Sequence, residues 1–231
     1  MKARVVVLVL LLGLLFFGDR MLEQWAEEFV ADQLVEQAGL ASAPEVDARG
    51  FPFLTQAVRG RYDEARIVLT AEQLGQPAGT GADVVLRGVR VPLSDVISGA
   101  VQEIPVDRVE GTATLSYGLL SEQLGPDTEL SQEGEGLRIT RTVGLAGRQL
   151  ALTATGQVTL EGDDLVVVVD EATGAGVEIP DGVLERAADL LDLRYPVPRL
   201  PFGLRLTGVS AATDGVVIQV EADDTVLRAV E

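Results

Sequence analysis

The sequence contains no histidine and no cysteine, two side chains that often act in covalent and metal-assisted catalysis. It therefore lacks a thiol nucleophile, a histidine-based triad, disulfides and the commonest zinc ligands. Its 36 acidic residues could supply paired carboxylates or calcium ligands. However, the acidic pairs at 163–164, 170–171 and 223–224 lack the spacing of a calcium loop, and no pattern positions two carboxylates for hydrolysis. We predict that the chain is not an enzyme and holds no metal or cofactor.

The most distinctive chemistry lies in Gly50–Tyr62, where aromatic side chains flank a proline in an otherwise aromatic-poor chain. Pro52 fixes its own φ, removes an amide donor and favours extended geometry at Phe51. The apolar segment Phe51-Pro52-Phe53-Leu54 is typical either of a loop that plugs a core or of the wall of an apolar ligand site. Both interpretations stay open on the residues alone.

Arginine side chains next to this segment could contact an anionic group. Arg59 and Arg61 follow it directly, and guanidinium groups at the mouth of a groove suit a phosphate. Ion pairs with the many acidic residues are the alternative explanation. The net charge of −18 disfavours nucleic acid as a partner, and it also disfavours electrostatic adsorption to anionic lipid. Any membrane contact should therefore be apolar or made by the N-terminus.

The first 18 residues have the layout of an export signal. Lys2 and Arg4 precede the apolar run Val5–Phe17, which is shorter than the ~20 residues that a spanning helix needs. No small-x-small cleavage motif follows the run. We predict a signal that is retained as a short anchor, with the protein at the extracytoplasmic face of the plasma membrane. A cleaved signal peptide is the alternative, and a buried N-terminal helix of a cytosolic protein is the third interpretation.

Residues 19–44 are predicted to form an amphipathic helix and a linker. Apolar residues recur at helical spacing over Asp19–Ala38, and Gly39 is a plausible helix stop. Trp25 follows the apolar run by about two helical turns. It could anchor at a membrane interface or pack on the body of the protein.

Residues 45–231 are predicted to form one α+β domain. Alternation with period two predicts strands joined by short turns, which indicates an antiparallel meander. The predicted strands are Val46–Arg49, Arg61–Thr70, Asp83–Val91, Val106–Tyr117, Gly134–Gly144, Arg148–Leu160, Leu165–Asp170, Phe202–Ser210 and Gly215–Ala222. The other predicted segments are a loop at Gly75–Gly81, a helix Ser94–Gln102 capped by Ser94, a helix or turn at Ser116–Leu124, a helix Asp181–Leu191, and a non-helical Tyr195–Pro201.

A curved antiparallel sheet that packs on a helix leaves a long apolar groove if its inner face is not filled. The predicted inner positions are mainly Val, Leu, Ile and Ala, so the walls of such a groove would be small and aliphatic. Each buried methylene of an acyl chain gains about 0.8 kcal/mol, which is ample without polar recognition. The same residues could equally close a dry core.

Two motifs resemble the signature of the LmeA-like phospholipid-binding family of actinobacterial envelope proteins. The first is Gly50-Phe51-Pro52-Phe53-Leu54-Thr55-Gln56 followed by Gly60-Arg61-Tyr62-Asp63-Glu64. The second is Leu200-Pro201-Phe202-Gly203-Leu204-Arg205-Leu206 followed by Thr213-Asp214-Gly215-Val216. The resemblance implies long curved antiparallel sheets wrapped around amphipathic helices in a tubular lipid-binding fold. It also implies a membrane-associated envelope protein that binds phospholipid or a lipid-linked intermediate.

From these patterns we expect a membrane-tethered, extracytoplasmic lipid-binding protein that supports the maturation of cell-envelope lipids or lipoglycans. The alternative is a non-catalytic envelope scaffold with a solid core that binds a protein partner. The residues expected to contact lipid are Phe51, Phe53, Leu54, Val96, Ile97, Leu184, Leu191 and Phe202, with Arg59 and Arg61 at the head group. Core packing is the alternative role of every apolar residue in this set.

Overall fold

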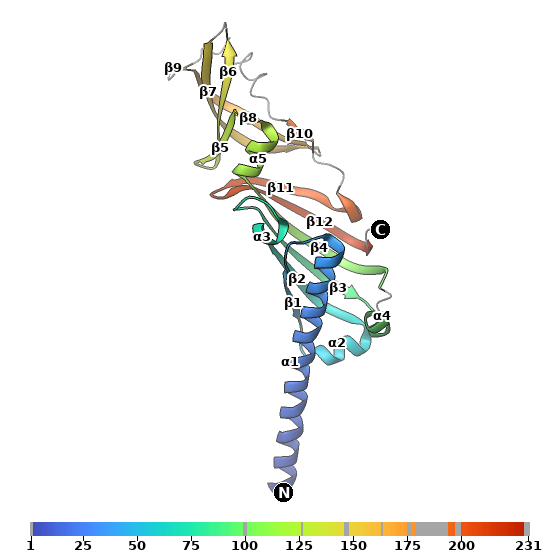
Figure 1. Cartoon of the computed structure of the whole chain (residues 1–231). Coiled ribbons are helices and arrows are strands. Elements are labelled where there is room, and N and C mark those ends of the chain that lie inside the picture. The colour runs from blue at the N-terminus through green and yellow to red at the C-terminus, as the bar shows by residue number, and fades with distance from the viewer. Residues whose placement is uncertain are drawn as a thin grey trace. The chain divides into compact units, whose positions relative to one another are not determined.

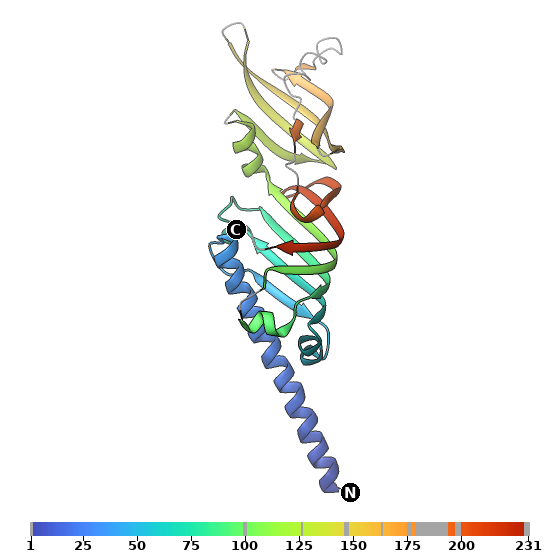
Figure 2. The same ribbon diagram turned by 90° about the vertical axis from the view of Figure 1, so that its right-hand side faces the viewer.

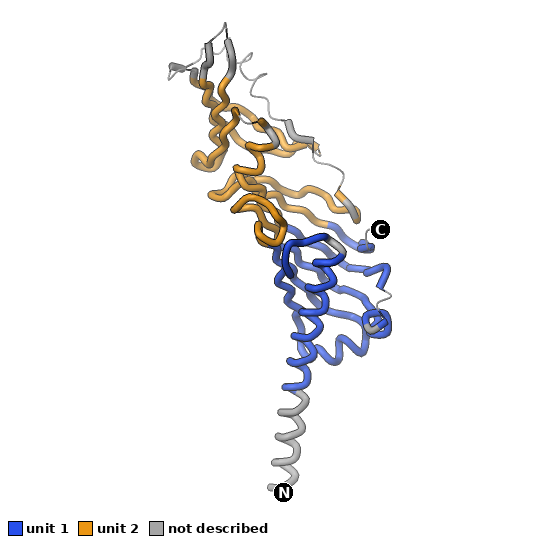
Figure 3. Tube along the Cα trace, in the orientation of Figure 1, with its two compact units in different colours: residues 1–69, 83–111, 222–231 blue, residues 70–82, 112–221 orange. Residues whose placement is uncertain are grey.

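The computed structural model describes residues 2–98, 101–125, 127–145, 148–162, 164–174, 177–178, 194–196 and 200–228. These residues form an α+β fold with two antiparallel sheets and a long N-terminal helix (Figures 1 and 2). The chain divides into two compact units (Figure 3). Unit 1 comprises Met1–Leu69, Asp83–Gly111 and Ala222–Glu231, and unit 2 comprises Thr70–Ala82 and Thr112–Glu221.

The N-terminal helix α1 runs without interruption over Lys2–Ala38 and ends before Gly39, which has φ 65°. The predicted helix over Asp19–Ala38 and its stop at Gly39 are therefore confirmed. Among the residues whose side chains the structure describes, from Phe16 onward, no helix is long and apolar enough to cross a membrane. The anchor at residues 1–18 stays a prediction.

The first sheet has six strands in the order β1-β2-β3-β4-β12-β11. β1 pairs with β2, and β11 pairs with β12, in antiparallel register. The period-two pattern located each of these strands, because alternation is a local property of a strand with one covered face. The strand bounds are β1 Glu45–Arg49, β2 Arg61–Thr70, β3 Gly81–Arg90, β4 Glu103–Ser116, β11 Arg205–Ala212 and β12 Gly215–Arg228.

Three short helices lie between the strands of this sheet: α2 Phe53–Arg59, α3 Ala71–Leu74 and α4 Leu93–Ser98. The interpretation of the aromatic segment as a loop is thus wrong from Phe53 onward, where the chain forms α2. A helix of seven residues is too short to show a hydrophobic period of its own, and it is marginal without tertiary contacts.

The start of α4 also differs from the prediction. The helix begins at Leu93, so Ser94 lies inside it and is not its cap. The carbonyl of Pro92 accepts hydrogen bonds from the backbone N–H groups of Asp95 (3.0 Å) and Val96 (3.2 Å). The side chain of Ser94 donates to Asp95 instead.

The second sheet, in unit 2, has the strand order β10-β8-β7-β6-β5, and β9 pairs with β8. All of its pairs are antiparallel, and the predicted hairpin around residues 134–160 is confirmed as β6 and β7. β5 was not predicted, because its sequence is polar and most of its residues are exposed. The bounds are β5 Thr128–Glu133, β6 Gly136–Leu145, β7 Arg148–Glu161, β8 Asp164–Gly174, β9 Val177–Glu178 and β10 Arg194–Pro196.

Unit 2 also contains helix α5 (Tyr117–Leu124), and the side chain of Ser116 caps it by accepting a hydrogen bond from Leu119 N at 3.2 Å. The core of this unit joins side chains of both sheets. Its buried members are Leu137, Leu165, Val216 and Ile218. Unit 2 is therefore closed by an apolar core of its own.

Several predictions fall on residues that the structure does not describe. They are the helix Asp181–Leu191, with the site residues Leu184 and Leu191, and part of the proline-rich segment before Leu200. Phe202 is described: it is half-buried in a short 3₁₀ turn, η1 (Pro201–Gly203), with φ 59°.

Candidate functional site

The aromatic segment folds around α2, and a carboxylate from α1 holds α2 in place. Asp19 is buried, and its Oδ2 and Oδ1 accept hydrogen bonds from the backbone N–H groups of Phe53 (3.0 Å) and Leu54 (2.6 Å). Pro52, at the N-cap, makes no side-chain cap bond. The first N–H groups of a helix lack intrahelical partners and carry partial positive charge. Asp19 therefore acts as the cap of α2 from a distant position in the sequence.

The inner face of α2 is buried in unit 1. Phe53 is 3% exposed, and its ring centroid lies 5.7 Å from that of Tyr62. Burial raises the pKa of the Tyr62 phenol. Gln56 and Ala57 complete this face, and Gln56 Oε1 accepts a hydrogen bond from Asp63 N at 2.7 Å. The inner face thus ties α2 both to α1 and to β2.

The outer face of α2 is apolar and exposed. Val58 is 75% exposed and lies one turn after Leu54 on the same side of the helix, and Phe51, just before the helix, is 62% exposed. The ring of Phe51 contacts Phe16 of α1, with 6.0 Å between the centroids. A surface helix of a water-soluble domain normally carries polar residues on its outward face. An exposed apolar face of this kind marks a contact surface.

The two arginines predicted at the head group have different surroundings. Arg61 Nη2 donates to Asp107 Oδ2 at 3.0 Å, so its charge is paired within unit 1. Arg59 is exposed in the last turn of α2 and has no ion pair among the described residues. Of the two guanidinium groups, Arg59 is therefore the one available to an external anion.

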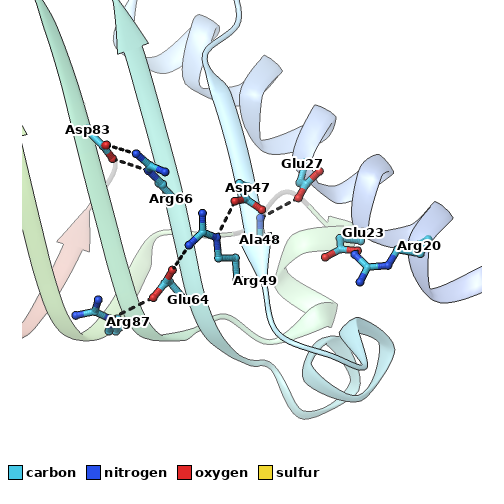
Figure 4. Close-up of polar contacts among 10 residues, drawn as sticks. All are labelled: Arg20, Glu23, Glu27, Asp47, Ala48, Arg49, Glu64, Arg66, Asp83 and Arg87. Carbon is cyan, nitrogen blue, oxygen red and sulfur yellow. Dashed lines mark hydrogen bonds and ion pairs between the residues drawn. The ribbon is translucent and has the colours of Figure 1, made fainter. Parts of the chain in front are cut away.

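A second carboxylate of α1 contacts the edge of the sheet. Glu27 Oε1 accepts a hydrogen bond from the backbone N–H of Ala48 at 2.8 Å (Figure 4). Burial raises the pKa of Glu27, although the bond from Ala48 opposes that shift. One turn earlier, Glu23 forms an ion pair with Arg20. Backbone N–H groups of α2 and β1 thus fix the position of α1.

A row of ion pairs crosses one face of the sheet in unit 1 (Figure 4). Arg49 on β1 bonds to Asp47 at 2.8 Å and to Glu64 on β2 at 3.3 Å. Glu64 also pairs with Arg87 on β3 at 3.2 Å, and Arg87 pairs with Glu110 on β4 at 2.6 Å. Side-chain hydrogen bonding from Arg108 lowers the pKa of Glu110. This face is polar and is not a wall for an acyl chain.

The opposite face of β1 and β2 is apolar. Successive side chains of a strand point to opposite sides of the sheet. The register places Val46 beside Ile67 and Ala48 beside Ala65, and all four residues are half-buried. We call these four residues the apolar sheet face. They are small aliphatic residues of the kind expected for an acyl-chain wall, but the sequence patterns alone did not single them out, because the pairing register comes from tertiary structure.

The remaining residues that were predicted to contact lipid do not all lie in unit 1. Val96 is half-buried on α4, which contacts α2 within unit 1. The side chain of Ile97 lies outside the described residues, as do Leu184 and Leu191. Phe202 belongs to unit 2. Unit 1 therefore brings together Phe51, Phe53, Leu54, Arg59 and Val96 around one short helix.

Asp19 was not predicted as a site residue. In sequence it is one more acidic residue on an amphipathic helix, and its partners are 34 and 35 positions away. The described residues contain no group of three or more His, Cys, Asp or Glu side chains that could hold a metal ion.

Unit 1 presents apolar side chains on α2 and on one face of its sheet, with Arg59 beside them, and this combination suits an apolar or amphipathic ligand. The chain belongs to the LmeA-like phospholipid-binding family, whose model matches residues 17–221. The resemblance inferred from the two motifs is therefore confirmed, and the match extends from the end of the apolar run into β12. No curated protein and no solved structure matches the chain.

Proposed function

We propose that this protein binds one phospholipid or lipid-linked intermediate while it is tethered to the membrane by its N-terminus. The observation that carries the proposal is the family match over residues 17–221. Membership of a phospholipid-binding family supplies the ligand class, and the exposed and half-buried apolar surfaces of unit 1 supply the chemistry that such a ligand needs.

The acyl chains would contact the apolar sheet face. Its side chains are aliphatic and half-buried, so they would line the path of an acyl chain. Each methylene moved from water into such a site gains about 0.8 kcal/mol, so about ten of them give strong binding without polar recognition. The phosphate would lie near Arg59, whose guanidinium group can donate two parallel hydrogen bonds to it.

The N-terminal sequence pattern supports the proposed membrane tether and the proposed extracytoplasmic location. Basic residues at positions 2 and 4 precede an apolar run, which is the order of an export signal. The protein would then face the extracytoplasmic side of the plasma membrane. There it would support maturation of cell-envelope lipids or lipoglycans by presenting or transferring its ligand.

Native mass spectrometry of the full chain, released from detergent micelles, tests the binding proposal. We expect one phospholipid per chain, which persists at activation energies that strip the detergent, and organic extraction should recover a phospholipid. Lipids that only surround an anchor would instead give a broad series of adducts. A clean apo mass after incubation with phospholipid micelles would overturn the proposal and favour the protein-binding scaffold.

A pair of variants localises the ligand. Ala65→Phe places a ring on the apolar sheet face, and Val58→Phe adds the same ring at an exposed position of α2. We expect Ala65→Phe to remove the lipid adduct and Val58→Phe to retain it. Equal retention by both folded variants would exclude the apolar sheet face as the wall of the site.

A further inference from the structure

Where α1 passes α2, apolar side chains gather on the surface of unit 1. The set comprises Phe16, Phe17 and Met21 of α1 with Phe51, Leu54 and Val58 of the α2 segment, and we call it the apolar collar. Phe17 is 70% exposed and Met21 is 73% exposed. Phe16 joins the two parts, because its ring lies 6.1 Å from Phe17 and 6.0 Å from Phe51 between centroids.

The α1 part of the collar covers an arc of about 140° of that helix, from Phe16 to Met21. At 100° per residue, Phe17 and Met21 lie about 100° and 140° around α1 from Phe16, whose ring contacts Phe51. The turns that follow carry acidic residues and Gln24 together with the exposed Trp25 and Val30. Exposed apolar side chains that lie together in this way mark a contact surface. Along the sequence, the α1 part of the collar directly continues the apolar run that begins at Val5.

The acidic groups within the collar are covered or paired. Asp19 is buried under the N-terminus of α2, where two N–H groups bond to it. Glu23 is paired with Arg20, whose guanidinium carbon also lies 5.9 Å from the centroid of the Phe16 ring. Arg59 adds a positive charge with no ion pair among the described residues. In a chain of net charge −18, the acidic side chains of α1 at this level are thus buried or paired, and two arginines lie beside the apolar side chains.

We propose that the outer face of α2 lies in the interface of a phospholipid bilayer and forms a second membrane contact beside the N-terminal helix. Phe51, Leu54 and Val58 would enter the boundary between head groups and acyl chains. Two contacts at different points on unit 1 fix its orientation on the membrane, whereas a single helix leaves it free to swing. This inference rests on the proposed membrane tether but not on the proposed lipid ligand.

The absence of cysteine from the sequence allows a site-specific test in the full chain. Val58→Cys places a polarity-sensitive fluorophore on the collar. Ser42→Cys is the matched control, because Ser42 is exposed and follows the far end of α1. About 25 residues of largely helical chain separate it from the collar, a distance of ~35 Å. Both labelled proteins are reconstituted into vesicles of phosphatidylcholine and phosphatidylglycerol, with and without brominated acyl chains.

We expect the Val58 label to shift to shorter wavelength and to be quenched several-fold more by brominated lipid than the Ser42 label. Equal quenching of the two labels, in vesicles with which the protein floats, would overturn the contact and leave the tether standing. A blue shift at Val58 without bromine quenching would also overturn it, since the face would then be covered by protein, such as a second copy of the chain. A chain that does not float with vesicles would overturn both the tether and this contact. A quenched Val58 label in a chain that gives no lipid adduct would support the contact while removing the proposed ligand.

Discussion

The two faces of α2 are both apolar, yet they have opposite environments. On the inner face Phe53 is buried against Tyr62, whereas on the outer side Phe51 and Val58 are among the most exposed apolar residues of the described chain. Phe51 and Phe53 are separated only by Pro52, so residue type does not distinguish them. Phe53 is the first residue of α2, which Asp19 and the cap at Gly60 hold in place, whereas Phe51 precedes the helix and contacts Phe16.

This contrast shows that an apolar residue is assigned to the core by the elements that surround it. Five predictions test how far the two faces differ, and they run from the largest expected effect to the smallest. The only tryptophan of the chain, Trp25, lies on α1 in unit 1, so its fluorescence reports the unfolding of that unit.

Replacing Phe53 with alanine should have the largest effect. The substitution leaves a cavity on the inner face, and buried Phe→Ala changes cost about 3–5 kcal/mol. Phe51→Ala is the matched control and should change the free energy of unfolding by less than about 1 kcal/mol. Denaturant titration of the full chain in mild detergent, followed by Trp25 emission, measures both. Equal losses in the two variants would mean that the two faces are not distinct.

Replacing Asp19 with alanine should release α2 from α1. Two backbone N–H groups lose their acceptor, and each buried polar group left unsatisfied costs about 1–3 kcal/mol. Hydrogen exchange of the Phe53 and Leu54 amides should accelerate more than that of the β6 and β7 amides in unit 2. Asp32→Ala, at an exposed position of the same helix, is the control. Unchanged exchange at Phe53 would show that Asp19 does not cap α2.

Replacing Gly60 with alanine should destabilise the end of α2. Gly60 has φ 62°, and a Cβ atom there would lie 3.0 Å from both the carbonyl oxygen of Val91 and the Cα of Pro92. The left-handed conformation alone costs an alanine about 1–2 kcal/mol. Gly39→Ala has nearly the same φ with nothing within 4 Å, so it isolates the conformational cost. A Gly60 variant as stable as the Gly39 variant would contradict the close contact with Val91.

Replacing Glu27 with glutamine should change the pH dependence of stability by a smaller amount. Because burial raises the pKa of Glu27 in the folded protein, the folded state holds this proton more tightly than the unfolded chain. Ionisation of Glu27 therefore lowers stability as pH rises from the unfolded pKa through the raised folded pKa.

The glutamine variant keeps an acceptor for Ala48 N and removes the charge. Its thermal midpoint should match that of the wild type at low pH and exceed it by a small margin at neutral pH. Glu28→Gln, at the exposed neighbouring position, is the control. A midpoint difference that does not vary with pH would exclude the role of burial at Glu27.

Replacing Val58 with serine should have the smallest effect on stability. The side chain is 75% exposed, so little apolar area is lost, and the free energy of unfolding in detergent should change by less than about 0.5 kcal/mol. The apolar collar would lose one of its members. Strong destabilisation would show that the outer face of α2 is covered within the molecule.

The strands were predictable to within a few residues in most cases. β2 matches its predicted bounds, and β1, β3 and β4 differ by one to three residues at their ends. Two errors have a common cause. The helix α2 and the strand β5 are short segments without a hydrophobic period, so contacts with the rest of the chain decide their structure.

The candidate site likewise combines residues that the sequence identified with residues that it did not. The sequence identified the aromatic segment and its arginines, because residue type and spacing carry that signal locally. It did not identify Asp19 or the pairing of Ala48 with Ala65. These depend on which distant segments meet, and periodicity does not encode that information.

The sequence by itself determined the family, the strand pattern, the lack of histidine and cysteine chemistry, and the order of a basic start and an apolar run. Each of these is a property of residue types and their local spacing. Only the tertiary structure decided that the chain forms a helix from Phe53 onward, which of the two phenylalanines beside Pro52 is buried, and which acidic residue supports the helix. The physical reason is that a carboxylate on α1 satisfies backbone groups of α2 across a separation of 34 residues, and local spacing does not specify that contact.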